Sequence, residues 1–369
     1  IRGYPPALQI GANAALDSAL GIPAPGTAGI VPGDLIFITS QPEQVEEMAL
    51  FGEFTFDLTD RIALTAGGRW YDTEVSFDAT SDGFANGGPS AFSGVQSESG
   101  FNPKVMASFD ATDNLNFYAS AAKGFRIGGV NGQVSPTLCG DELDRVGLDP
   151  DSLRTYDSDN LWSYEVGVKS RLADNRVSLN AAAFFIDWSD SLQVQRLACG
   201  FQVDANVGDV ESRGFEVELS AAPIDGLTLD VGVGYTDTEV ASAAGDGFPG
   251  YAEGQALHGV PDWTGTGSAQ YIFPAFSGWD GRLRADANYY GDSTSFNNGA
   301  IVDRDSWSAL NLRAGVLNEN WDVTLFADNV TDERANLADN RSIAAEMPGR
   351  PRIVTNRPRT IGLEARYRF

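Results

Sequence analysis

The chain is poor in the side chains that catalyse reactions, bind metals or contact nucleic acids. Its 369 residues include one histidine and two cysteines, and 25 basic residues stand against 51 acidic ones, for a formal charge of −26. Nucleic acids and anionic lipid surfaces both attract basic segments, so this charge argues against either as a partner. His258 has no serine or cysteine at the spacing of a nucleophilic motif. We therefore predict a protein that is not an enzyme, without cofactor or metal site.

Long apolar runs are also missing, and none approaches the ~20 residues of a membrane-spanning helix. A membrane-spanning strand needs only about 9–11 residues, half of them facing lipid, so a mean hydropathy of −0.19 is compatible with a chain embedded in a membrane. Residues 1–6 contain no Met start, charged n-region or apolar h-region of a signal peptide. We expect that processing or truncation removed what preceded them.

What the chain does contain is an alternation of apolar and polar residues with a period of two. The last nine residues place aliphatic or aromatic side chains at odd positions and Gly, Glu or Arg at even positions, and end on Phe369. The same alternation recurs over 50–58, 62–66, 115–121, 177–185, 215–220, 227–236, 283–290 and 321–328. Each segment therefore predicts a strand with one face in water and one in a dry environment.

The connections between these strands alternate in length. Short turns rich in Asp, Asn and Gly lie at 58–60, 111–113, 173–175, 223–226 and 318–320, with 273–280 somewhat longer. Long connections lie at 78–99, 127–159, 189–210, 239–258, 291–304 and 331–355. This pattern predicts an all-β, antiparallel, up-and-down transmembrane β-barrel of about 13 strands, with short periplasmic turns, long extracellular loops and Phe369 on the periplasmic side.

A soluble β-sandwich or solenoid is the alternative, because its strands also have one apolar and one polar face. Three features favour the membrane barrel. The loop lengths alternate strictly, the strands are long, and aromatic residues such as Trp70, Trp188, Trp263 and Trp321 gather at strand ends, as in the girdles at membrane interfaces.

Five segments resemble the C-terminal half of the β-barrel of TonB-dependent receptors, the gated outer-membrane transporters of Gram-negative bacteria. They are Asn116–Asn131, Ser163–Ser170, Glu211–Glu218, Asp328–Arg334 and Arg357–Leu363. The family's barrel has 22 strands and is plugged by an N-terminal domain. The resemblance thus implies that residues 45–369, with about 13–14 strands, are the C-terminal part of such a barrel, that 1–44 form an extracellular or irregular segment, and that the plug is absent.

The resemblance also implies a function and its partners. We expect energy-coupled uptake of a scarce solute, such as an iron–siderophore complex, a cobalamin-like molecule or an oligosaccharide. The partners implied are a TonB-type energy-transducing complex, reached through the missing plug, outer-membrane lipid and lipopolysaccharide, and a small-molecule ligand bound by loops 127–159 and 189–210. The alternatives are a passive porin-like channel, whose gene would encode no plug, and a soluble secreted β-structured adhesin.

Three sets of residues are candidates for function. Cys139 and Cys199 fall in two extracellular loops, and in an oxidising compartment we expect them to form a disulfide. Tyr367 and Phe369 are, by the resemblance, a barrel-assembly signal. Polar residues predicted to face the lumen either pair across strands or contact a plug or passing solute; they are Glu53, Arg69, Glu216, Glu218, Asp230, Arg284, Asp286, Arg313, Glu364 and Arg366.

Overall fold

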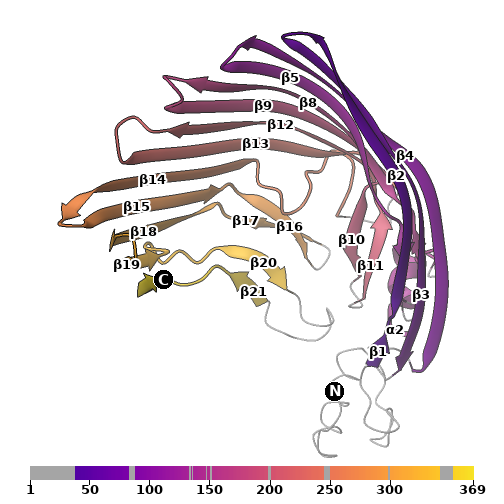
Figure 1. Ribbon diagram of the computed structural model, residues 1–369. Helices are drawn as coiled ribbons and strands as arrows, with labels where there is room; N and C mark the ends of the chain where they lie inside the picture. The colour runs from indigo at the N-terminus through magenta and orange to yellow at the C-terminus, as the bar shows by residue number, and fades with distance from the viewer. Residues whose placement is uncertain are drawn as a thin grey trace, which may run out of the picture.

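The computed structural model describes residues 38–82, 88–132, 134, 136–146, 148–149, 152–197, 201–244, 250–297, 300–340 and 352–369. Fourteen strands form one antiparallel sheet, and eight short strands form four separate pairs. The large sheet curves strongly, and the short pairs that are labelled in Figure 1 lie on its hollow side. The predicted all-β, antiparallel, partial barrel is confirmed.

The order of the strands in the sheet follows the order in the chain. β1 (Ile38–Ser40) and β2 (Glu43–Thr59) both pair with β3 (Ile62–Asp82), so the fourteen strands occupy thirteen positions. The sheet continues through β4 (Ser90–Thr112), β5 (Leu115–Arg126), β8 (Asp159–Leu172), β9 (Val177–Ser189), β12 (Gly208–Ala221), β13 (Leu227–Ala243), β14 (Trp263–Phe276), β15 (Trp279–Tyr290), β18 (Trp307–Leu317), β19 (Trp321–Asp328) and β22 (Thr360–Tyr367).

β1 and the first residues of β2 lie inside the segment 1–44, which we expected to be irregular. They are strands because β3 extends far enough to pair with them, from Ile62 opposite Thr59 to Asp82 opposite Ile38. Pairing therefore begins at Ile38 rather than near residue 45. Residues 1–37 lie outside the described residues.

Short and long connections alternate, but two predicted bounds are wrong. Most of 78–99, predicted as a long connection, is strand, because β3 runs to Asp82 and β4 begins at Ser90, paired from Asp78 opposite Ser93 to Ser81 opposite Ser90. The turn predicted at 273–280 is strand except for 277–278. The short ones span 60–61, 113–114, 173–176, 222–226, 277–278 and 318–320. Gly226 is needed in one of them, because its φ is 81° and a Cβ there would lie 2.0 Å from the carbonyl oxygen of Ile272. The long connections carry β6 (Gly129–Val130), α2 (Pro136–Val146), β7 (Thr155–Tyr156), β10 (Leu192–Arg196), β11 (Gln202–Asn206), β16 (Ser293–Asn297), β17 (Ala300–Arg304), β20 (Asn336–Asn340) and β21 (Arg352–Thr355). In the part of the chain that the structure describes, no helix has the length and apolarity to cross a membrane.

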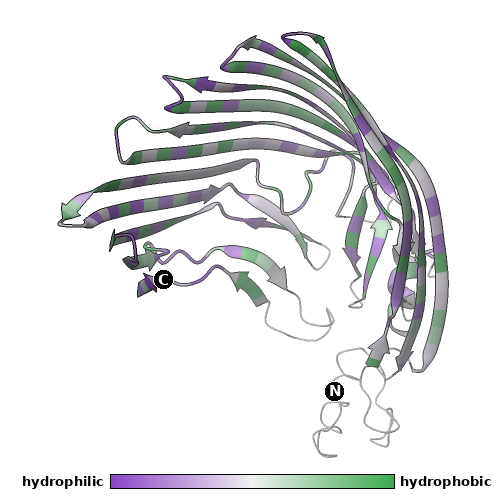
Figure 2. Ribbon diagram, viewed as in Figure 1, coloured by the Kyte–Doolittle hydropathy of each residue, from purple (hydrophilic) through white to green (hydrophobic). Residues whose placement is uncertain are grey.

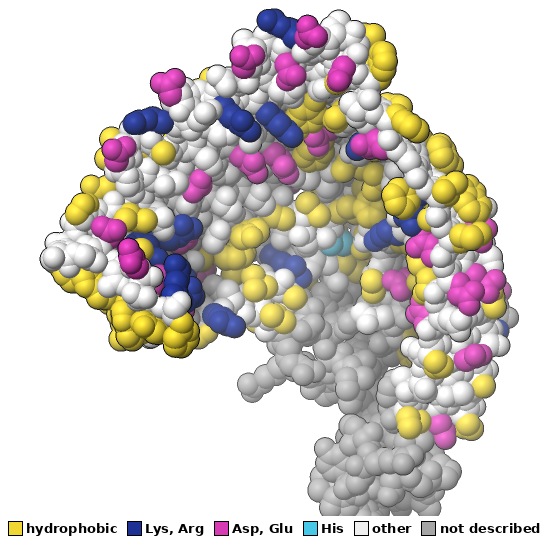
Figure 3. Space-filling view, viewed as in Figure 1, with side chains coloured by type: hydrophobic (Ala, Val, Ile, Leu, Met, Phe, Trp, Pro, Cys, Tyr) yellow, Lys and Arg dark blue, Asp and Glu magenta, His cyan; other side chains and the backbone are white. Residues whose placement is uncertain are grey.

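The sheet is one layer thick and leaves a large apolar face uncovered. Apolar and polar residues alternate along its strands (Figure 2), and Leu50, Phe54 and Leu363 are 74%, 82% and 70% exposed. Yellow apolar side chains occupy the outer rim of the curved sheet, while many charged side chains point toward its hollow (Figure 3). A continuous exposed apolar surface of this kind marks contact with lipid or a partner, and here it has the alternation of a membrane barrel wall.

Without a second layer, the strands pack mainly against their neighbours, and rings lie over glycines. A Cβ on Gly167 would lie 2.6 Å from the ring of Tyr118, one on Gly214 would lie 2.7 Å from Phe184, and one on Gly362 would lie 2.5 Å from Phe326. The absence of a side chain at each glycine lets the ring cover the neighbouring backbone. These contacts supply part of the packing that a soluble protein obtains from its core.

We predict that Gly167→Ala destabilises the sheet, because the new Cβ must displace the ring of Tyr118. Overpacking of this kind costs about 1–3 kcal/mol. Gly52→Ala is the matched control, since nothing lies within 4 Å of its Cβ position. Thermal unfolding in detergent micelles, followed by circular dichroism, should show a lower midpoint for Gly167→Ala alone. Equal midpoints for the two variants would contradict the packing role.

Candidate functional site

Two long connections on one side of the sheet fold together into what we name the loop module, residues 127–158 and 190–207. A hydrophobic core cluster forms within it from both loops and consists of Val134, Cys139, Leu143, Leu153, Leu197 and Val203, with Leu148 and Phe201 packed against it. On α2, Cys139 and Leu143 are four residues apart and buried, whereas Asp141 and Asp144 are exposed. The loop module is thus a packed unit rather than a pair of extended loops.

The hairpin β10–β11 contributes one of its faces to this unit. Gln195 pairs with Val203, and both are buried, while Val194 pairs with Asp204 on the opposite face and is 57% exposed. Alternation along a strand explains the difference, because successive side chains point to opposite faces. One face of the hairpin therefore closes the core, and the other is open to solvent.

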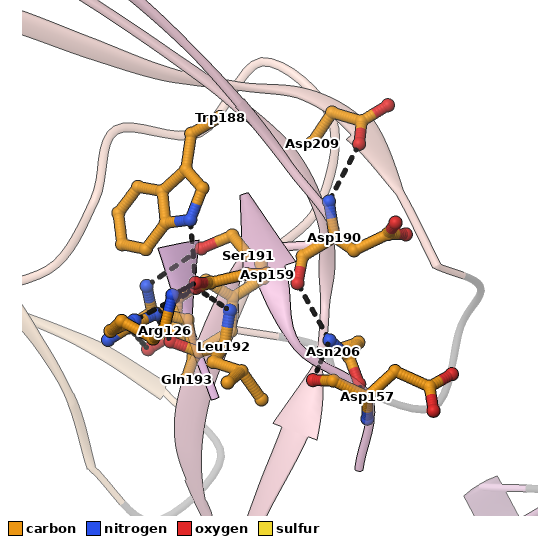
Figure 4. A network of polar contacts seen from close by, with 11 residues as sticks. Arg126, Asp157, Asp159, Trp188, Asp190, Ser191, Leu192, Gln193, Asn206 and Asp209 are labelled. Atoms are coloured by element: carbon orange, nitrogen blue, oxygen red, sulfur yellow. Dashed lines mark hydrogen bonds and ion pairs between the residues drawn. The ribbon is translucent and has the colours of Figure 1, made fainter. Parts of the chain in front are cut away.

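A buried carboxylate fixes the loop module to the sheet. Asp159, the first residue of β8, has a side chain only 2% exposed. It accepts hydrogen bonds from the backbone N–H of Arg126 at 3.1 Å, from Nε of Arg126 at 2.9 Å, from Nε1 of Trp188 at 2.8 Å and from the backbone N–H of Leu192 at 3.0 Å. A second guanidinium nitrogen of Arg126 completes the ion pair (Figure 4). The ends of β5, β8 and β9 and the start of β10 therefore meet at one anion, whose charge is paired and fully hydrogen-bonded.

Two asparagine side chains join the strands inside the module. The amide of Asn131 donates to the carbonyls of Leu153 at 2.9 Å and Asp204 at 2.7 Å, and its oxygen accepts the N–H of Asp204 at 2.8 Å. The amide of Asn206 donates to the carbonyl of Asp157 at 3.1 Å, and its oxygen accepts the N–H of Asp157 at 3.0 Å. Each amide uses both its donor and its acceptor to satisfy backbone groups of the other loop.

Asn206 also donates to the carbonyl of Asp190 at 2.8 Å. The two asparagines and the Asp159 hub were missed by sequence reasoning. Asn131 and Asp159 are far apart in the chain from their partners, and no local motif marks residues that meet only when two loops fold together.

The predicted disulfide involves one residue that the structure describes and one that it does not. Cys139 is disulfide-bonded and completely buried in the core of the loop module. Cys199, the other cysteine of the chain, lies outside the described residues. The pairing of Cys139 with Cys199 stays a prediction, and Cys139 lies where such a bond would tie the two loops together.

The cross-strand register places the predicted lumen-facing residues on one face of the sheet. Residues paired directly opposite each other point the same way, so the face can be followed from β2 to β22 through the ladder. The residues on that face include Glu53, Arg69, Glu216, Glu218, Asp230, Arg284, Asp286, Arg313, Glu364 and Arg366. This is the concave face, since the opposite one carries the exposed apolar side chains.

Most charges on the concave face are paired. Lys104 and Glu53 are 2.9 Å apart, Arg284 and Asp286 are 2.6 Å apart, and Arg366 and Glu364 are 2.6 Å apart. Arg69 is paired with Glu47, and Arg313 lies 3.4 Å from Asp286 and 3.0 Å from Asp328. Asp230 accepts hydrogen bonds from the hydroxyls of Ser220 and Ser268. Such partly exposed pairs contribute little stability each, but they keep the wall hydrated and close to neutral.

Glu216 and Glu218 differ from the paired charges of this face. Their cross-strand neighbours are Ala182 and Gly234 for Glu216, and Asn180 and Gly232 for Glu218. Both side chains are exposed, and within the described residues neither forms an ion pair. They are therefore open to whatever occupies the channel.

Sequence reasoning missed further residues of the concave face. Tyr118 donates a hydrogen bond of 2.5 Å to Glu165, and Nζ of Lys169 lies 5.2 Å from the centre of the Tyr118 ring. Arg282 pairs with Asp322 at 2.7 Å. The alternation along each strand could have found them, because they lie on the same face of the sheet as the predicted lumen-facing set.

His258 joins two other extracellular connections. Its Nε2 lies 2.8 Å from the carbonyl oxygen of Gly250 and therefore donates to it, while Nδ1 lies 2.9 Å from the hydroxyl of Thr294. The imidazole ring stacks on Phe296 and contacts Tyr251 edge-on. Sequence reasoning favoured an ordinary surface histidine, but β16 packs against the loop, and the resulting burial lowers the pKa of His258. The backbone hydrogen bond opposes that shift, and Arg304 adds to it.

A curved antiparallel sheet with a lipid-type convex face, a charged concave face and folded loops at one end defines part of the wall of a membrane β-barrel. The family model described as TonB dependent receptor-like, beta-barrel matches residues 11–330, and the chain belongs to this family. Barrels of this family lie in the outer membrane of Gram-negative bacteria, which confirms the predicted location.

Curated relatives and solved structures agree with this assignment. The metal-pseudopaline receptor CntO of Pseudomonas aeruginosa is 25% identical over 316 residues, covering 85% of this chain and 40% of the relative. The pesticin receptor of Yersinia pestis is 24% identical over 340 residues, covering 88% of this chain and 44% of the relative. The ferric yersiniabactin uptake receptor FyuA from Yersinia pestis superposes with a TM-score of 0.74 at 19% identity, over 90% of this chain and 47% of that one. The chain thus spans less than half the length of these proteins.

We predict that Asp159→Ala loosens the loop module. Trp188 Nε1–H and the Leu192 N–H lose their acceptor, at about 1–3 kcal/mol for each donor left unsatisfied. Trypsin should then cleave at Arg154, inside the module, several times faster than in the unsubstituted protein. Asp113→Ala, in an exposed turn at the other end of the sheet, is the control and should leave the cleavage rate unchanged. Equal rates for all three proteins would show that the hub does not hold the loops.

We also predict that the contact between the loop 250–262 and β16 depends on pH. The folded-state pKa of His258 is lowered from 6.5, so the contact is fully present above pH 6.5 and is lost as the pH falls through the lowered value. Hydrogen exchange at residues 250–258 and 293–297, expressed relative to the intrinsic exchange rate at each pH, should accelerate between pH 7 and pH 5. In His258→Gln, which retains an N–H donor for Gly250, this acceleration should disappear; its persistence would assign the effect to another group.

Proposed function

We propose that this chain is the C-terminal part of the barrel of a TonB-dependent receptor that takes up a scarce solute, and that the solute is a metal–chelate complex. The family match over residues 11–330 carries the proposal. The relatives are named as receptors for metal-pseudopaline, ferric pyoverdine and pesticin. Two of these names state a metal complex, which favours a chelate over an oligosaccharide or a cobalamin-like molecule. The folded loop module at the extracellular end provides a surface for the first capture of the solute.

The sheet supports a larger barrel around it. Among the described residues, β2 and β22 are each paired along one edge only. Unpaired backbone groups cannot be hydrogen-bonded by water inside a bilayer, so both edges require further strands. We infer that strands of the same receptor supply them, in keeping with the 22-stranded barrels that are plugged inside. An N-terminal plug would then face Glu216, Glu218 and the paired charges of the concave wall and would connect the receptor to a TonB-type complex.

Outer-membrane lipid and lipopolysaccharide are the partners proposed for the convex face. At its extracellular end, Tyr235 lies 4.9 Å from Trp263 and 5.8 Å from Phe215, measured between ring centres. At its periplasmic end, Tyr367 lies 4.8 Å from Trp321 and 5.2 Å from Phe369. Aromatic clusters at two levels match the interfacial girdles of membrane barrels. Tyr367 and Phe369 are exposed there, where a barrel-assembly factor would reach them.

We predict that deletion of the receptor gene reduces growth when iron is supplied only as a ferric chelate. Accumulation of radiolabelled iron, measured over a panel of ferric chelates, should fall for at least one chelate and recover when the gene is restored. Loss of the TonB-type partner should abolish the same uptake, because translocation requires energy from the inner membrane. Uptake that continues without that partner would support the passive channel instead.

A further inference from the structure

Arg126 lies where the channel wall meets the loop module. It is the last residue of β5 and is paired in register with Asp159. The even-numbered residues of β5 share the concave face, since Ala122 is paired with Lys104 and Ser120 with Glu165. Arg126 therefore stands at the extracellular end of the concave wall, directly below the loops.

The guanidinium of Arg126 is held on three sides. Asp159 binds two of its nitrogens, the carbonyl oxygen of Leu192 accepts a hydrogen bond from one of these at 2.6 Å, and the ring of Trp188 lies 4.7 Å from its central carbon. The third nitrogen, Nη1, donates no hydrogen bond to any of the described residues. The group is thus fixed in place while the side of it formed by Nη1 keeps two free N–H donors.

The two partners of this ion pair are exposed to very different degrees. The Arg126 side chain is 52% exposed and that of Asp159 is 2% exposed. In other pairs of the concave face the two values are close, as for Lys104 and Glu53 at 46% and 50% or Arg282 and Asp322 at 22% and 17%. An ion pair that serves only to hold the structure together does not require a buried carboxylate and a guanidinium that is half exposed to solvent. The arrangement instead resembles a support for a guanidinium that binds something in the channel.

The surroundings of Arg126 indicate the kind of molecule. On the solvent-open face of the hairpin β10–β11, Val194 offers an apolar contact beside Asp204. Burial raises the pKa of the Asp204 carboxyl, and the charge of Arg126 opposes this shift. Guanidinium N–H donors bind carboxylates and other negatively charged oxygens through charge-assisted hydrogen bonds, and the two N–H groups of Nη1 are the ones free to do so. Because Arg126 is already ordered, binding loses little conformational entropy.

We propose that Arg126 is a specificity-determining residue of the receptor, and that the two free N–H groups of its Nη1 bind a carboxylate or similar oxyanion on the transported chelate. This inference rests on the proposed function and adds to it the chemical group that the loops select. The residues that hold the guanidinium are positioning residues: Asp159, Trp188 and Leu192. Their contacting groups are already used in binding Arg126.

The test compares two ferric chelates of opposite charge on the complete receptor in detergent. Ferric citrate, which carries carboxylates, and the cationic trihydroxamate complex ferrioxamine B are the probes. In Arg126→Lys the charge and a bond to Asp159 remain, but the two N–H donors of Nη1 are lost. We expect about tenfold weaker binding of ferric citrate and unchanged binding of ferrioxamine B. Arg213→Lys, in an ion pair with Asp237 on the convex face, is the matched control and should change neither.

A second variant separates binding from positioning. Asp159→Asn keeps an acceptor for Trp188 and removes the charge that orients Arg126, so it should weaken binding of ferric citrate and also speed cleavage at Arg154. Arg126→Lys loses the bond to the Leu192 carbonyl but leaves Asp159 paired, so it should speed that cleavage less than Asp159→Asn does. Equal weakening of both chelates in Arg126→Lys, or no weakening, would overturn the proposal. Wild-type binding of ferrioxamine B without ferric citrate, or of neither chelate, would overturn the proposal while the proposed function stands. The proposed function fails only if no chelate of the uptake panel depends on the receptor.

Discussion

The pairing of backbone groups between neighbouring strands is the constraint on which the rest of this structure depends. Inside a bilayer no water is present to bond an unpaired N–H or carbonyl, so each strand must be held by its neighbours through most of its length. The register that results decides the chemistry of both faces, because a slip of one residue would exchange them. Glu216 is paired with Gly234 and lies on the concave face, whereas Val217 is paired with Val233 and lies on the convex face.

A wall of one layer leaves the protein two other sources of tertiary stability. Within the sheet, rings such as those of Tyr118 and Phe326 cover the glycines of the next strand. Outside the membrane, the loop module builds a small core of its own around Cys139 and Leu143. The loop module is therefore packed around a core of its own, whereas the wall is a single curved sheet. The Asp159 hub links the two, so that the position of the loops follows the position of the strands.

Sequence reasoning recovered the parts of this protein that depend on period and order. Alternation gave the strands and the concave set from Glu53 to Arg366, and the lengths of the connections gave the side on which the loops lie. It did not find the contacts of Asp159, Asn131 or His258, and it joined the loops 127–159 and 189–210 only through the predicted disulfide of Cys139 and Cys199. Each of those residues has partners many positions away in the chain, so no local pattern carries the contacts. The pairing of β1 with the end of β3 was missed for the same reason, since it depends on how far β3 extends.

The sequence by itself determined the architecture: strands of period two, short turns at one end, long loops at the other, and one polar face. The period of two follows from the geometry of the extended backbone, and the difference between the faces follows from contact with lipid on one side and water on the other. Only the tertiary structure decided which polar groups come together above the channel. Arg126 and Asp159 are 33 positions apart, and Leu192 lies 66 positions from Arg126. Arg126 and Asp159 meet because β5 and β8 pair in register. Leu192 reaches them only when the two loops fold over a shared core, where burial rather than periodicity sets the arrangement.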